Sequence, residues 1–217
     1  SINTSTGAID LSASTMGTYA VKYVTSSSIC ADSTTFNVTL TATNTVSLNG
    51  AYDISTATFV QNFSLAAQET FPTAISFNND GTKMYVLGDA GNDVNEYSLS
   101  TAFDVSTASY VQRFAVGSQE IYPHGMSFNN NGTKMYITGY SGDDVNEYSL
   151  STAFDISSAS YVTRFVISQE SSPRGMTFNN DGTKMFIVGS QGDDVNEYSL
   201  STAFDISSAS YVQRFVV

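Results

Sequence analysis

One segment of about 50 residues occurs three times along this chain, and this repeat constrains the fold more than any single motif. Each copy opens with a proline and continues through F-N-N-[D/N]-G-T-K-M-[Y/F]. The copies run from Pro72 to Glu120, from Pro123 to Glu170 and from Pro173 to Val217. A fixed period of about 40 to 50 residues, rich in strand formers, indicates propeller blades or another stacked array. We therefore do not expect an independently catalytic globular fold.

The composition predicts an all-β protein. Ser, Thr, Asn and Tyr are abundant, tryptophan is absent and only 13% of the 217 residues are charged, which suits many short strands better than long amphipathic helices. Within the second copy we expect four strands, at residues 125–128, 134–138, 145–150 and 161–166. The N-N-[D/N]-G turn between the first two is typical of a hairpin, because glycine accepts a positive φ. Four strands per copy are typical of a propeller blade.

The sequence predicts two regions. Residues 47–217 hold the repeats, with blades at about 69–116, 120–167 and 170–217. Residues 52–66 match the tail of a repeat, and we expect them to form an orphan outer strand. The fold class is thus a partial β-propeller of about three four-stranded blades, preceded by a different module at residues 1–46.

The repeats resemble the YVTN family of β-propellers, whose blades carry P-x-G, then D-G-T-K-x-[YF]-V, then a G-D-D-x-V-like strand. The resemblance covers about 165 residues and implies the fold but not one function. Propellers of this kind occur in surface-layer proteins, adhesins, lactonases and dehydrogenases. Three blades and one strand are too few for a ring of four to eight blades, so the sequence favours a fragment of a longer polypeptide over a ring or filament completed by several chains.

The first 46 residues also have strand periodicity, at 8–12, 18–24 and 35–41. The segment G-A-I-D-L-S-A-S-T-x-G-T-Y-x-V-x-Y, followed by Cys30 and T-x-x-F-N-V-T-L, resembles Ig-like modules of very large bacterial surface proteins, including adhesins. The resemblance implies a partial Ig-like β-sandwich, in which Cys30 would pair with a cysteine on an earlier strand outside this chain.

Charge and hydropathy exclude two classes of partner. The net charge of −12 and the pI near 4.1 argue against binding nucleic acid or anionic lipid. We expect no membrane insertion, because no apolar run approaches the roughly 20 residues that span a bilayer. The start of the chain has neither a basic nor an apolar signal region, so it reads as a mature or internal segment.

Few residues suit catalysis or metal binding. His124 is the only histidine, and no H-x-H or H-E-x-x-H spacing occurs. The acids Asp93, Asp144 and Asp194 begin a repeated D-x-N-E-Y segment and are weak candidates for Ca²⁺; a turn that bonds its own backbone is the preferred interpretation. We expect no other cofactor. The repeated Glu96, Glu147 and Glu197 are expected to form structural ion pairs with the repeated lysines or arginines, because a buried carboxylate needs a partner.

The positions that differ between copies mark the surface that the blade architecture leaves free. They fall on the connections between blades and between the second and third strands, which emerge at the same end of a blade. The contact candidates there are Tyr122, His124, Tyr140 and Arg174. Drift in exposed loops is the alternative explanation.

These observations together favour a non-enzymatic segment of an extracellular or cell-surface protein, serving adhesion, display or scaffolding. Its partners would be a protein or glycan on another surface, or other copies of itself. The alternatives are a carbohydrate-binding lectin and a self-assembling ring or filament. A propeller hydrolase or lactonase ranks last, because such a site usually gathers histidines and acids around a metal.

Overall fold

The computed structural model describes residues 17–24, 33–40 and 54–216. The chain divides into two compact units, Ser1–Phe59 and Val60–Val217, and each is described by itself. In the first unit, β1 (Gly17–Val24) and β2 (Ser33–Leu40) pair antiparallel, with Gly17 opposite Leu40. Two of the three strands expected there are confirmed. The third, at 8–12, and Cys30 lie outside the described residues, so the Ig-like module remains a resemblance.

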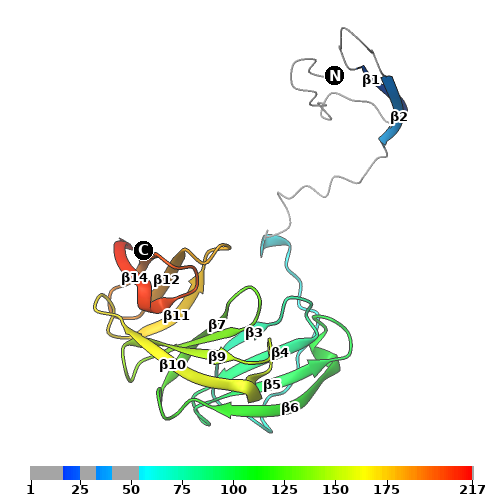
Figure 1. Ribbon diagram of the computed structural model, residues 1–217. Helices are drawn as coiled ribbons and strands as arrows, with labels where there is room; N and C mark the ends of the chain where they lie inside the picture. The colour runs from blue at the N-terminus through cyan, green and yellow to red at the C-terminus, as the bar shows by residue number, and fades with distance from the viewer. Residues whose placement is uncertain (1–16, 25–32, 41–53, 217) are drawn as a thin grey trace. The chain divides into compact units, whose positions relative to one another are not determined.

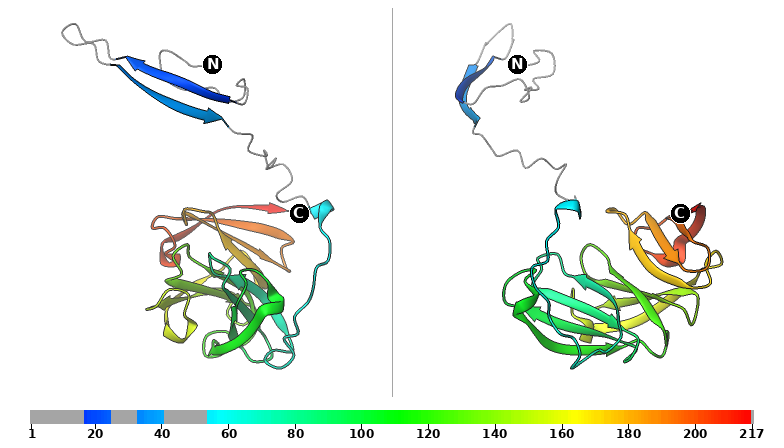
Figure 2. Two further views of the ribbon diagram at one scale, coloured as in Figure 1. Left: turned by 90° about the vertical axis from the view of Figure 1, so that its right-hand side faces the viewer. Right: turned by 180° about the vertical axis from the view of Figure 1, so that it is seen from behind.

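The second unit contains three four-stranded antiparallel sheets, one for each copy of the repeat (Figures 1 and 2). In each sheet the strands pair in chain order, so each blade is a simple meander. Blade 1 comprises β3 (Pro72–Phe77), β4 (Lys83–Gly88), β5 (Asp93–Leu99) and β6 (Ala108–Ala115). Blade 2 comprises β7 (Pro123–Phe128), β8 (Lys134–Gly139), β9 (Asp144–Leu150) and β10 (Ala159–Val166). Blade 3 comprises β11 (Pro173–Phe178), β12 (Lys184–Gly189), β13 (Asp194–Leu200) and β14 (Ala209–Val216). The all-β class and the four-stranded repeat are confirmed.

In each blade, side-chain contacts hold the turn between the first two strands and the bend after the third strand, which is called the corner. In blade 2, Asn129 Oδ1 accepts from Lys134 N at 3.0 Å, and Gly132 has a φ of +69° as the turn requires. After the third strand, Phe154 takes a φ of +57° and lays its ring over Gly132, where any Cβ would collide with it. The short 3₁₀ turns η3 (Val105–Thr107), η4 (Ile156–Ser158) and η5 (Ile206–Ser208) follow this corner in the three blades. Each is capped by the preceding aspartate.

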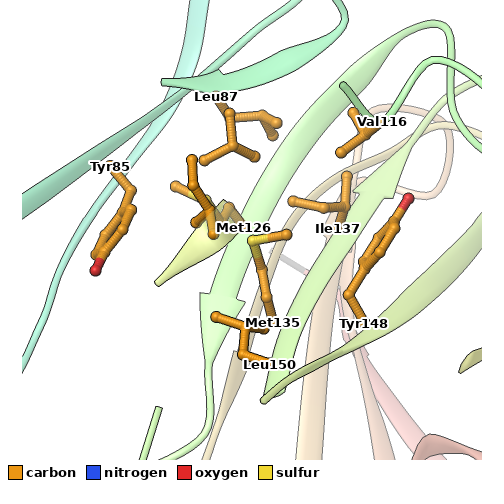
Figure 3. Close-up of a cluster of buried hydrophobic side chains, with 10 residues drawn as sticks. Tyr85, Leu87, Val116, Met126, Met135, Ile137, Tyr148 and Leu150 are labelled. Carbon is orange, nitrogen blue, oxygen red and sulfur yellow. The ribbon is translucent and has the colours of Figure 1, made fainter. Parts of the chain in front are cut away.

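Two of the three hydrophobic clusters of the described residues lie between blades, and the third lies on blade 1, where Phe63 and Leu65 pack against it. One cluster joins Tyr85, Leu87 and Val116 of blade 1 to Met126 and Ile137 of blade 2, as Figure 3 shows. A second cluster joins blades 2 and 3 in the same way, through residues such as Tyr136 and Ile187. Because blades 1 and 2 and blades 2 and 3 bury the faces that they turn to each other, contacts between neighbouring blades stabilise the array.

Polar contacts at the corner reinforce these interfaces. Lys83 Nζ and Tyr85 OH both donate to Phe154 O of the next blade, at 2.8 and 2.6 Å. Lys134 Nζ and Tyr136 OH donate to Phe204 O in the same way, at 2.8 and 2.6 Å. The interface between blades 1 and 2 and the interface between blades 2 and 3 are therefore formed by the same positions of the repeat.

Residues 60–65 take the place of an outer strand from a preceding blade. Gln61 Nε2 donates to Asp104 Oδ1 at 2.6 Å, as Gln112 Nε2 donates to Asp155 Oδ1 at 3.0 Å one blade later. The ring of Phe63 packs edge-on against Tyr97, with centroids 5.7 Å apart. This segment, predicted as part of the orphan strand 52–66, forms no ladder in the described part of the chain, where η2 (Ile54–Thr56) precedes it.

Candidate functional site on the loop face

The end of the blades where the variable connections emerge is called the loop face here. It carries the four residues expected from the sequence as contact candidates. Tyr122 precedes β7 and His124 lies in β7, whereas Tyr140 directly follows β8 and Arg174 lies in β11. The structure joins them in two pairs. The rings of Tyr122 and Tyr140 meet edge-on with centroids 6.2 Å apart, and Arg174 Nη1 lies 3.3 Å from His124 Nε2.

A polar hollow opens beside the tyrosine pair, between the loops of blades 2 and 3. Its volume is about 480 Å³. Its lining consists of Tyr122, Tyr140, Ser141, Asp143, Ser171, Ser172 and Gln191. Hydroxyl, amide and carboxylate groups thus surround two exposed aromatic rings, a combination that suits a small polyhydroxylated molecule.

His124 is held in its neutral form by its surroundings. Burial lowers its pKa below 6.5, and the charge of Arg174 lowers it further, while Asp89 opposes the shift. Because guanidinium can only donate, the contact with Arg174 identifies Nε2 of the neutral imidazole as the acceptor. A neutral imidazole therefore lies beside a permanent cation, and the two residues belong to the first strands of neighbouring blades.

The third member of this variable position plays a different part. Thr73 occupies in β3 the place of His124 in β7, and its hydroxyl donates to Pro123 O at 2.8 Å. Thr73 therefore joins β3 to β7. The imidazole and guanidinium groups of this variable position lie between blades 2 and 3.

The sequence analysis missed the carboxylates that shape the loop face, Glu69, Glu120 and Glu170. Glu120 is fully buried and accepts from the backbone N–H of Tyr122, Ser141 and Gly142, at 2.7, 3.0 and 3.3 Å. It therefore binds the loop that carries Tyr122 to the loop that follows Tyr140. Its side chain fits because Gly139 offers no Cβ. The signal was present in the sequence, since a Gln-Glu pair stands shortly before the opening proline of every copy.

Asp143 brings an unusual carboxylate to the hollow. It has a φ of +47°, and its buried Oδ1 has no hydrogen-bond partner among the described residues. Burial raises the pKa of this carboxyl, and Glu170 raises it further. The equivalent Asn92 donates to Ile121 O and Asp89 O, at 2.6 and 3.0 Å, when its amide is turned so that Nδ2 faces these two acceptors. A donor in the first interface is thus replaced by an acceptor in the second.

The calcium candidates are engaged within their own blades. Asp144 Oδ1 accepts from Asn146 Nδ2 at 2.6 Å, and its Oδ2 lies 3.4 Å from Arg164 Nη1. Asp93 and Asp194 make the same two contacts in blades 1 and 3. Within residues 17–24, 33–40 and 54–216, no three His, Cys, Asp or Glu side chains form a group suited to a metal ion. These aspartates therefore join the third strand of each blade to its fourth strand.

The expected ion pairs are confirmed, with the lysines as partners of the glutamates. The Nζ–Oε1 distances are 2.8 Å for Lys83–Glu96, 2.8 Å for Lys134–Glu147 and 2.7 Å for Lys184–Glu197. The repeated arginines pair instead with Asp93, Asp144 and Asp194. The repeated charges are therefore structural.

Known structures share the fold, although no protein-family model and no curated protein sequence matches the chain. A protein from Lactobacillus plantarum is 13% identical over 67% of this chain and 41% of its own, with a TM-score of 0.50. The periplasmic gluconolactonase PpgL of Pseudomonas aeruginosa is 13% identical over 66% and 38%, with a TM-score of 0.47. A protein of Bacteroides uniformis described as a candidate 6-phosphogluconolactonase is 15% identical over 67% and 42%, with a TM-score of 0.48. The β-propeller domain of Myceliophteria thermophila Cps50 (Swd1) also matches, with a TM-score of 0.45.

At these identities the likeness concerns the fold alone, and the three four-stranded sheets of the repeat region resemble part of a β-propeller. The chain spans about two fifths of the length of these structures. The YVTN family itself remains a resemblance.

These comparisons contradict the function expected from the sequence. A non-enzymatic segment for adhesion, display or scaffolding was ranked first and a propeller lactonase last, yet structures named as lactonases are among those of like fold. The ranking rested on the single histidine, which was taken as an argument against catalysis. It did not consider that neighbouring blades place His124 against Arg174.

The described residues contain no helix long and apolar enough to span a membrane.

Proposed function

We propose that the loop face between blades 2 and 3 binds a sugar lactone and hydrolyses it to the open-chain hydroxy acid. The observation that carries this proposal is the pairing of neutral His124 with cationic Arg174. Tyr122 and Ser172, which line the polar hollow, lie two residues before His124 and Arg174 in the sequence. The names of the lactonases of like fold suggest only which substrates to try first.

Lactone hydrolysis needs a base and an oxyanion stabiliser. On substrate binding, Arg174 would turn its N–H from His124 Nε2 to the lactone carbonyl oxygen, where it would stabilise the developing negative charge. His124 Nε2, released from that contact, would accept a proton from water while the water oxygen bonds to the carbonyl carbon. When the ring C–O bond breaks, the same proton passes from the imidazole to the leaving oxygen. Water is the only co-reactant, so the step balances with the groups that the chain supplies.

The hollow would position the sugar. Tyr122 and Tyr140 offer apolar ring surface to the carbon skeleton, while Ser141, Ser172 and Gln191 offer partners to its hydroxyl groups. The clamp formed by Glu120 would fix both tyrosine loops before the substrate arrives.

The extracellular or cell-surface location remains a proposal, supported by the acidic composition of the chain and its resemblance to surface-protein modules.

The test is the rate of acid release from glucono-δ-lactone at constant pH, above the uncatalysed rate. We expect His124→Asn to lower kcat about 100-fold or more, as general bases typically contribute at least that factor. Arg174→Gln should lower kcat as well and should raise the pKa of His124, whose imidazole signal is unambiguous by NMR because the chain has one histidine. Val162→Ala, in the exposed middle of β10, is the control and should leave the rate unchanged.

A rate equal to the uncatalysed reaction with this lactone and its 6-phosphate would overturn the proposal. Catalysis that persists undiminished in His124→Asn would overturn the role of that residue.

A further inference from the structure

The interface between consecutive blades is built twice from the same repeat positions. The face that a blade turns to the next blade along the chain is called its outgoing face, and the opposite face is called its incoming face. On the outgoing face, the second strand provides a lysine and a tyrosine that donate to the phenylalanine carbonyl after the third strand of the next blade. The same tyrosine packs on the phenylalanine that ends the next inner strand: the Tyr85–Phe128 and Tyr136–Phe178 centroids are both 4.7 Å apart. The outer strand adds a ring, since Phe114 packs on Tyr148 and Phe165 on Tyr198.

Blade 3 presents the equivalent surface without a neighbour in the described structure, with Phe186 in place of the tyrosine. The side chain of Lys184 is 51% exposed, against 31% for Lys83 and 28% for Lys134. Val188 is 42% exposed and Phe215 is 70% exposed. An apolar hollow of about 330 Å³ lies on this face and is lined by Gly175, Met176, Thr177, Phe186, Ile187, Val188 and Val195.

Blade 1 presents the matching incoming surface. Phe103 is 58% exposed, whereas its counterparts Phe154 and Phe204 are half-buried under the preceding blade. Ile75 is also exposed, beside an apolar hollow of about 220 Å³. Most of the apolar part of this surface is covered within the same chain, because Met84, Val86, Tyr97 and Leu99 are at most 5% exposed and Phe63 and Leu65 pack against them. Gln61 also donates to Asp104 at its corner.

We propose that the outgoing face of blade 3 docks on the incoming face of blade 1 in a second copy of this chain. Lys184 would then reach Phe103 O of the second copy, as Lys83 and Lys134 reach the corners of blades 2 and 3. Gln213 and Phe215 of β14 would replace Gln61 and Phe63 of the second copy and displace its residues 60–65. The sequences agree with this exchange, because F-V-Q-N-F-S at 59–64 and Y-V-Q-R-F-V at 211–216 share the aromatic, valine, glutamine and phenylalanine positions.

Two such contacts would join two copies in a ring of six blades, which is within the usual range of four to eight. The contact is heterologous, so it closes only when the rotations of the blades add to a full turn. Each copy carries a net charge of −12, so added salt should strengthen the association by screening the repulsion between copies.

The experiment is sedimentation equilibrium of the full chain over a wide concentration range. We expect a monomer of 23.2 kDa in equilibrium with a species of twice that mass. Val188→Asp should weaken association by at least about tenfold, because it would place an unpaired charge in the apolar contact. Val162→Asp is the matched control, since Val162 is 50% exposed on the outer strand of blade 2 and should leave the association unchanged. Circular dichroism checks that both variants stay folded.

A third variant tests the exchange itself. Phe63→Ala weakens the hold of residues 60–65 on blade 1, so it should strengthen association. A strictly monomeric wild type, a dimer insensitive to Val188→Asp, or weaker association of Phe63→Ala would each overturn the proposal. None of these outcomes depends on lactone hydrolysis.

Discussion

At the scale of single residues, the most informative side chains are those that join two loops. Glu120 is buried, and burial raises its pKa, although three backbone N–H donors oppose the shift. Its equivalents make the same contacts, since Glu69 accepts from Phe71 N and Gly91 N, and Glu170 from Ser172 N and Gly192 N. A carboxylate in this position joins two loops of the loop face.

Glu120→Ala should therefore destabilise the protein and loosen both tyrosine loops. Removing the acceptor leaves buried N–H groups without a partner, at a cost of about 1–3 kcal/mol. Urea unfolding would measure the change, and amide hydrogen exchange should accelerate at Ser141 and Gly142. Ser141→Ala is the control, because only its backbone takes part in the clamp. Unchanged exchange at these amides in Glu120→Ala would contradict this role.

The residue scale is also where sequence reasoning reached its limit. It found Tyr122, His124, Tyr140 and Arg174 from differences between copies, because variation marks positions that packing leaves free. It could not pair them as observed, since the His124–Arg174 contact joins two blades. The positive φ of Phe154 was also missed, because nothing in the motif S-T-A-F-D shows that its ring covers Gly132.

At the scale of elements, the strands were predictable and the interfaces were not. Alternation and the N-N-[D/N]-G turn located all four strands of a blade, and the observed strands extend the expected ones by one or two residues at an end. The inter-blade hydrogen bonds depend on the stacking of one sheet on the next. No local pattern encodes that stacking.

Tyr136→Phe tests one of these interfaces. The Tyr136 hydroxyl donates to Phe204 O at 2.6 Å, and Lys134 Nζ remains as a second donor after its loss. We expect a loss of about 0.5–1.5 kcal/mol in the free energy of unfolding, since the substitution removes one hydrogen bond and keeps the ring. Tyr211→Phe, with its exposed ring on β14, should change stability little. Equal losses in the two variants would argue against the corner hydrogen bond.

At the scale of the whole molecule, the balance of charge determines how stability depends on pH. Burial raises the pKa of Asp93, Asp144 and Glu120, so the folded state holds more protons at these groups than the unfolded state does. Stability therefore rises as the pH falls from neutral toward their ordinary pKa values of 3.8 and 4.5. The capping aspartates Asp155 and Asp205 have lowered pKa values, mainly because Ser157 and Ser207 donate to them, and their contribution is lost only at lower pH.

We expect the urea midpoint to be higher at about pH 5 than at pH 8 and to fall again below about pH 4, as these two groups of carboxyls titrate. His124, whose lowered pKa has the opposite effect, opposes this trend at one site. Asp144→Asn should flatten the rise between pH 8 and pH 5, because it removes one of the raised carboxyls. A midpoint that falls steadily from pH 8 to pH 5 would contradict this assignment.

The placement of the core between blades bears on how such an array can change in length during evolution. Every group that one sheet presents to the next comes from a fixed position in the 50-residue unit, so an in-frame duplication or deletion of one unit leaves each remaining junction chemically matched. Unequal recombination within the gene can therefore lengthen or shorten the protein without compensating substitutions, while the loops at one end remain free to diverge.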